Sequence, residues 1–187
     1  MTADRHELCA AISEETDRID RMAAHLWDGD CDFSADSGHP GWSYGHVAAH
    51  IARGSDYLSG ILLSGSTDPG DLRGNALERS REIDREATRP GAVIITDVEQ
   101  AVHRFADLVE TLPDEQWSTM PIVTEGRPAS VVHLIETWLR EMRIHVPALA
   151  LDYEPNGDPA EGECQLAELL PRDSHRRHSS VSPRRPM

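Results

Sequence analysis

The sequence predicts an all-α four-helix bundle followed by a short tail. Apolar residues recur at steps of three and four along four long segments, which is the period of amphipathic helices that bury one face. No segment shows the strong alternation of apolar and polar residues that is typical of a strand. The 187 residues suit one domain, and long helices joined by sizeable connections favour a bundle.

The first two predicted helices are separated by a polar loop. Residues 3–27 form the first helical segment, and residues 28–41 are rich in Gly, Asp and Ser, which is typical of a loop. Ser43 has the side chain of an N-cap and is expected to start a second helix that ends near Leu63. The predicted buried faces contain Leu8, Ile12, Ile19, Met22 and Leu26 in the first helix and Val47, Ile51, Leu58 and Ile61 in the second.

A charged segment lies between the second and third long helices. Residues 64–75 are predicted as a loop, and residues 76–87 as a short, charged helix that is broken at Pro90-Gly91. Residues 93–112 form the third long helix, which Pro113 stops. Its predicted buried face contains Ile94, Val98, Val102, Phe105 and Val109.

The last long helix follows a segment without helical period. Residues 118–128 indicate either an extended excursion or a short hairpin, and Ser130 is expected to cap the helix behind them. The stretch 137–151 is its most informative part, because charged and imidazole side chains accompany its apolar stripe. That stripe contains Val131, Ile135, Trp138, Met142, His145 and Leu149.

The composition changes beyond Tyr153. The chain becomes acidic and turn-rich there, and from Arg172 onward it is Arg-rich and is predicted to be disordered. We therefore expect residues 1–153 to form one domain and residues 154–187 to form a largely disordered tail.

The net charge limits the class of partner. The formal charge is -15, and the residues before Arg172 carry 13 arginines against 32 acidic residues. Such an acidic surface disfavours nucleic acid and anionic membranes as partners. We expect a monomer or homodimer. Three scattered cysteines, no signal-type apolar core and no segment of transmembrane length predict a cytoplasmic protein with reduced thiols.

Two pairs of residues spaced i, i+4 carry ligand-type side chains. Glu141 and His145 share one face of the last helix, and His46 and His50 share one face of the second. At 100° per residue, His145 lies inside an apolar stripe, His50 and Glu141 lie on stripe borders, and His46 lies on a flank.

Three side chains that commonly bind zinc therefore point inward from two helices. They are His50, Glu141 and His145, and such an open triad is typical of a catalytic metal site rather than of a closed structural one. The alternative is that Glu141 pairs with an arginine and that His145 is a hydrogen-bonded core histidine.

Four segments, taken in order, carry a family resemblance. They are GWSYGHVAAHIAR at 41–53, RSREID at 79–84, LPDEQW at 112–117 and LREMRIH at 139–145. They resemble motifs of the mycothiol-dependent maleylpyruvate isomerase family, which belongs to the DinB-like superfamily of metal-binding four-helix bundles. The resemblance covers roughly residues 5–153.

The resemblance implies site residues as well as a fold. It implies a Zn²⁺ ion, or another divalent metal, bound by His50, Glu141 and His145. It also implies a catalytic arginine, which corresponds to Arg79, with Arg81 as the second choice. The alternative for both arginines is a solvated helix face.

The same resemblance implies mycothiol as thiol cofactor and a small, unsaturated, anionic electrophile as substrate. A metal-activated thiolate would add to a conjugated double bond, and rotation followed by loss of the thiolate would complete a cis–trans isomerisation. Characterised isomerases of this type carry a second, C-terminal domain where this sequence has a tail. A mycothiol S-transferase in detoxification or secondary metabolism is therefore the alternative enzyme, and a metal-binding regulator is the non-enzymatic hypothesis.

Overall fold

The protein is a helical bundle with one small hairpin. The computed structural model describes residues 4–28, 31–64, 69–119, 122–124 and 127–149. Within these ranges the chain forms six helices and one two-stranded antiparallel sheet, which confirms the predicted all-α class. The predicted domain boundary at Tyr153 and the predicted tail lie outside the described residues.

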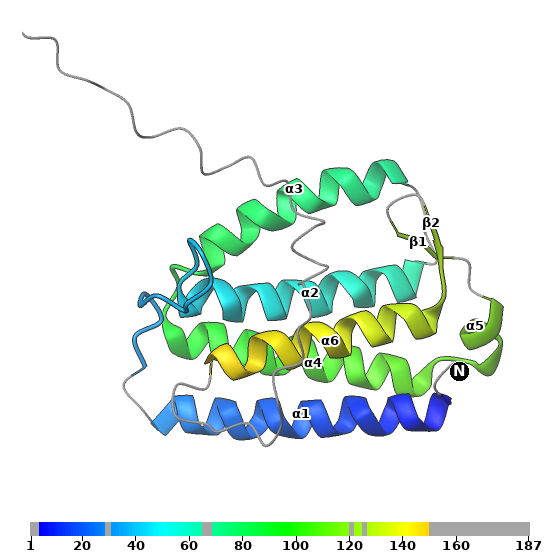
Figure 1. Ribbon diagram of the computed structural model, residues 1–187, viewed down its shortest axis with the longest axis horizontal. Coiled ribbons are helices and arrows are strands. Elements are labelled where there is room, and N and C mark those ends of the chain that lie inside the picture. Colours follow the sequence, from blue (N-terminus) through cyan, green and yellow to red (C-terminus); the bar gives the residue numbers. More distant parts are fainter. Residues whose placement is uncertain (1–3, 29–30, 65–68, 120–121, 125–126, 150–187) are drawn as a thin grey trace, which may run out of the picture.

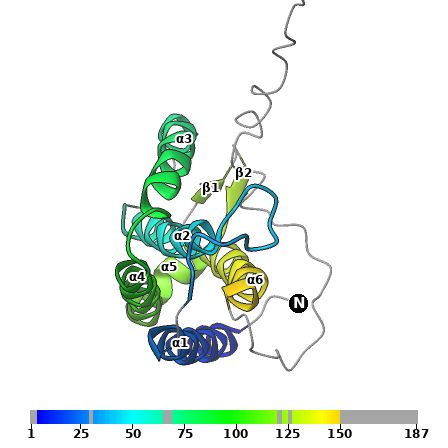
Figure 2. The same ribbon diagram turned by 90° about the vertical axis from the view of Figure 1, so that its left-hand side faces the viewer.

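Four long helices enclose the core. They lie side by side in Figure 1, and Figure 2 shows them end-on, with α2 between α4 and α6 and with α1 opposite α2. All apolar residues predicted for the four inward faces are buried. The four are α1 (Arg5–Asp28), α2 (Tyr44–Ser64), α4 (Gly91–Thr111) and α6 (Val131–Leu149).

A crossover helix, α3 (Pro69–Glu86), joins α2 to α4. Because α2 and α4 run in the same direction, the chain must return along the bundle, and α3 does so on the outer side of α2 (Figures 1 and 2). The prediction of a loop over residues 64–75 is therefore wrong, since the helix already begins at Pro69. Proline fits the first helical position, but Gly70 and Gly74 have low helix propensity, so the sequence does not indicate a helix there.

The N-caps of α2 and α6 differ. Ser130 accepts a hydrogen bond from the His133 backbone N–H at 3.1 Å, as predicted for a capping serine. At α2 the Ser43 hydroxyl instead hydrogen-bonds His46 Nδ1 at 2.8 Å, and the Ser43 backbone N–H donates to the same nitrogen at 3.2 Å. His46 thus reaches back to the start of its own helix, as a glutamate does in a capping box.

The connection between α4 and α6 holds the remaining elements. A short helix, α5 (Asp114–Thr119), contains most of the LPDEQW segment. Strands β1 (Ile122–Thr124) and β2 (Arg127–Ala129) then pair antiparallel, so that the hairpin alternative is confirmed.

A hydrogen-bonded tryptophan ties three helices together at the centre of the bundle. The Trp138 ring stacks on Phe105 of α4 with centroids 4.7 Å apart. Its Nε1–H donates to Ser55 Oγ of α2 at 2.9 Å, and that hydroxyl donates to the Ile51 carbonyl at 2.9 Å. The buried indole N–H is thereby satisfied, which makes a large aromatic side chain tolerable at this position.

The start of α2 is fixed by a close backbone contact. A Cβ atom at Gly45 would lie 2.4 Å from the Ala87 carbonyl oxygen, so only glycine fits there. The Gly45 backbone N–H donates to the Phe33 carbonyl at 2.8 Å. These contacts hold the segment 31–43 against the end of the bundle at which α2 begins (Figure 1).

Candidate metal centre

The three predicted ligands meet between α2 and α6. His50 lies near the start of α2, and Glu141 and His145 lie near the end of α6; because these neighbouring helices are antiparallel, the two ends lie side by side (Figure 1). Glu141 Oε2 is 3.5 Å from His50 Nε2 and 3.2 Å from His145 Nε2. All three side chains are buried, with at most 4% of any residue exposed.

The distances and atom types fit a metal ion. The candidate ligand atoms all lie within 4.8 Å of one another. In a tetrahedral site with bonds of about 2.1 Å, ligand atoms are separated by about 3.4 Å, which is close to the observed 3.2 and 3.5 Å. Two imidazole nitrogens and one carboxylate oxygen are a donor set that zinc accepts. Metal binding by these residues remains a prediction that this geometry supports.

The electrostatic environment favours the metal-binding form of His50. Burial is the main cause that lowers the pKa of His50 below its ordinary value, and the charges of His145 and Arg79 add to this. The hydrogen bond and the charge of Glu141 act in the opposite direction. A neutral imidazole is the form that coordinates a metal, so a lowered pKa keeps the ligand available at neutral pH.

His46 is not part of the group of close ligand atoms. Its Nδ1 bonds Ser43, and its Nε2 lies 3.9 Å from Asp84 Oδ1 on α3. Its ring stacks on Trp42, with centroids 6.5 Å apart. This placement agrees with the flank position that the helical period predicted.

Two aromatic side chains of the segment 31–43 cover the triad. The Trp42 ring centroid lies 5.1 Å from that of His50, and the His39 centroid lies 5.2 Å from that of His145. Burial and the nearby His145 lower the pKa of His39. The sequence did not single out either residue, because loop residues have no period and only the tertiary fold places them here.

Arg79 lies on α3 beside the triad. Only 7% of the residue is exposed, and its guanidinium carbon lies 3.9 Å from the centroid of the Tyr57 ring on α2. Burial lowers the pKa of Arg79, and the contacts with Tyr57 oppose this. The solvated-face alternative is therefore wrong for Arg79, whereas Arg81 is exposed. A catalytic role for Arg79 remains a prediction.

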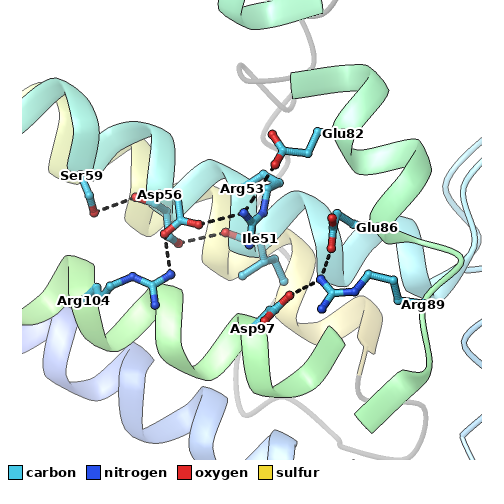
Figure 3. Close-up of polar contacts among 10 residues, drawn as sticks. Ile51, Arg53, Asp56, Ser59, Glu82, Glu86, Arg89, Asp97 and Arg104 are labelled. Atoms are coloured by element: carbon cyan, nitrogen blue, oxygen red, sulfur yellow. Dashed lines mark hydrogen bonds and ion pairs between the residues drawn. The ribbon is translucent and has the colours of Figure 1, made fainter. Parts of the chain in front are cut away.

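Ion pairs hold α3 in place. Arg53 of α2 lies 3.2 Å from Asp56 and 3.7 Å from Glu82 of α3. Near the end of α3, Glu86 shares Arg89 with Asp97 of α4, as Figure 3 shows. These partly exposed pairs are individually weak, at roughly 0–1 kcal/mol, but together they join the helix that carries Arg79 to α2 and α4.

A large surface pocket has none of the triad residues in its lining. Its volume is about 490 Å³, and it is lined by Leu26, Trp27, Cys31, Asp32, Phe33, Gly91, Ala92 and Ile95. Burial and the neighbouring Asp32 raise the pKa of the Cys31 thiol. A raised pKa reduces the thiolate fraction, so Cys31 is poorly suited to be a nucleophile.

Comparison with known proteins identifies the family. A family model described as mycothiol maleylpyruvate isomerase N-terminal domain matches residues 12–150. The chain belongs to this family. Neither curated proteins nor solved structures gave a match.

Family membership connects the fold to the site. The mycothiol maleylpyruvate isomerase N-terminal domain match covers most of the bundle, including the triad and Arg79. The protein is thus a mycothiol-related, DinB-like bundle with a His-Glu-His group whose ligand atoms lie within 4.8 Å of one another. No described helix combines the length and hydrophobicity needed to cross a membrane.

Proposed function

We propose that this protein is a mycothiol-dependent metalloenzyme of the maleylpyruvate isomerase type, acting on a small unsaturated anion and using Zn²⁺. The observation that supports this most strongly is the buried Glu141 carboxylate, which both His50 Nε2 and His145 Nε2 approach. Burying one carboxylate between two imidazoles is costly unless its negative charge is balanced, and a divalent cation can balance it.

Each residue around the triad has a distinct task in this proposal. His50, Glu141 and His145 would hold the ion, which would act as a Lewis acid and lower the pKa of a bound thiol. Trp42 covers the triad and limits the access of water. Arg79 binds the substrate carboxylate and stabilises negative charge that develops during the reaction.

The burial of Arg79 supports its proposed role in binding an anion. Its Nη1 is inaccessible to solvent and has no hydrogen-bond partner within the described part of the chain. A guanidinium usually has its donors satisfied when buried, so an anionic ligand is a suitable partner for this nitrogen.

The decisive experiment combines metal analysis with thiol-binding calorimetry. We expect one zinc per chain, binding of mycothiol to the zinc-loaded protein, and no binding after chelation. NMR of reactions with maleylpyruvate and other unsaturated anions then distinguishes an isomerised product from a stable thiol adduct, which is the S-transferase outcome.

Two results would reject the proposal. A metal-loaded protein that binds no thiol at millimolar concentration favours the regulator hypothesis. A protein that purifies without stoichiometric metal, and takes up none when zinc is added, favours a structural bundle.

A further inference from the structure

Two buried polar atoms near the triad have no hydrogen-bond partner among the described residues. One is Arg79 Nη1, and the other is Nε2 of His39. Arg79 lies close enough to His50 to influence its protonation, whereas the His39 ring packs edge-on against His145, with centroids 5.2 Å apart. Each histidine of the triad therefore has one unsatisfied polar group beside it.

The position of His39 is set by its loop. Its backbone N–H donates to Ser37 Oγ at 3.3 Å, and its carbonyl accepts from the Trp42 N–H at 3.0 Å. The Gly38 N–H donates to Asp36 Oδ1 at 2.9 Å, and Gly38 has a φ of 79°, which favours glycine. Because the backbone is held on both sides, the imidazole stays over the triad.

A buried imidazole nitrogen without a partner is unfavourable unless a ligand or water supplies one. A metal ion is a poor candidate for this partner. His39 is not part of the group of ligand atoms within 4.8 Å of one another that the described residues provide. A molecule that binds beside the triad is a suitable partner.

We propose that His39 Nε2 hydrogen-bonds the thiol that binds at this centre, and so determines affinity for the thiol. This inference rests on the proposed function and extends it to a residue outside the metal ligands. The guanidinium of Arg79 carries a full charge and suits the anionic electrophile, whereas an imidazole nitrogen suits a polar, uncharged partner. The amide and hydroxyl groups of mycothiol provide such partners.

The test compares His39→Phe with His39→Gln in the zinc-loaded protein. Phenylalanine keeps a ring over His145 but removes the hydrogen bond, and glutamine restores a polar group. Calorimetry with mycothiol is expected to show at least about tenfold weaker binding for His39→Phe, partial recovery for His39→Gln, and unchanged zinc content and melting temperature for both. His133→Gln, at an exposed histidine on the first turn of α6, is the matched control.

A second readout does not depend on activity. In the cobalt-substituted protein, the thiolate-to-cobalt absorption band should saturate at a higher mycothiol concentration for His39→Phe than for wild type, with the same final intensity. Equal dissociation constants for wild type and His39→Phe would overturn the role of His39 but leave the proposed function intact. Loss of zinc in His39→Phe would identify it as a metal ligand instead. If wild type binds metal but no thiol, both proposals fail.

Discussion

His50 and Glu141 are 91 positions apart in the chain, and their side chains lie 3.5 Å apart in the core. Their contact joins the start of α2 to the end of α6, and Glu141 is 1% exposed. Burial of either side chain without the other would cost free energy, because each is a polar group removed from water. This contact, shared with His145, is the structural basis for the predictions about metal and thiol.

His50→Ala should remove metal and thiol binding together. The variant leaves two ligands, so zinc affinity should fall by more than about 100-fold, as measured by chelator competition. His46→Ala is the matched control, because His46 bonds Ser43 and lies on the same helix one turn earlier. If His46→Ala loses zinc and His50→Ala keeps it, the triad assignment is wrong.

Arg79→Ala should keep zinc and mycothiol but reduce turnover by roughly 100- to 1,000-fold. Only the substrate or transition-state charge loses its partner, so kcat/KM should fall while thiol affinity stays constant. The comparison is Arg81→Ala, since Arg81 is exposed on the same helix. Normal turnover in Arg79→Ala together with a defect in Arg81→Ala would show that Arg81 is the functional arginine.

Replacing Glu82 and Glu86 together should loosen α3 without unfolding the bundle. Glu82 pairs with Arg53, and Glu86 pairs with Arg89. Because such pairs contribute roughly 0–1 kcal/mol each, Glu82→Gln and Glu86→Gln should have small effects singly. The double variant should increase amide hydrogen exchange in residues 78–86 and leave exchange in α1 unchanged. Faster exchange throughout all helices would contradict this local role.

Ser55→Ala should destabilise the protein by about 1–3 kcal/mol, because it leaves the buried Trp138 N–H without an acceptor. Ser59→Ala is a close control, since Ser59 also donates to a carbonyl one turn earlier on α2 but accepts no tryptophan N–H. Urea unfolding should show a loss within about 0.5 kcal/mol for Ser59→Ala. Equal losses for the two variants would mean that the indole hydrogen bond contributes little.

Truncation after Tyr153 should leave helicity and cooperative melting almost unchanged. The change in composition beyond that residue motivates this, since a polar, charged segment buries too little apolar surface to fold. Circular dichroism of the truncated and full-length proteins tests it. A large decrease in melting temperature would indicate that Leu166, Leu169 and Leu170 dock on the bundle.

The helical period of the apolar residues was sufficient to predict the bundle and the inward direction of the triad. The stripes of α1, α2, α4 and α6 are all buried, because a helix with one apolar face has few ways to hide it except against other helices. The same arithmetic directed His50 and His145 inward and His46 to the flank, where the structure leaves 25% of the His46 side chain exposed. These features depend on local spacing, which the sequence contains.

Local spacing failed where a segment depends on its neighbours. Pro69 begins a helix that Gly70 and Gly74 disfavour, and α3 is joined to α2 and α4 by ion pairs from Arg53 and Arg89. Weak intrinsic propensity is overridden when tertiary contacts supply the missing free energy. The helix that the sequence predicted in place of α3 was therefore too short.

The sequence by itself determined the four amphipathic helices, their family and three candidate ligands, because each follows from residue type and spacing along the chain. Only the tertiary structure decided that Arg79 is buried against Tyr57 while Arg81 is exposed, and that His39 covers His145. Both placements depend on how a crossover helix and an irregular loop pack on the bundle. Packing is set by contacts between segments far apart in the chain, and no local period encodes these contacts.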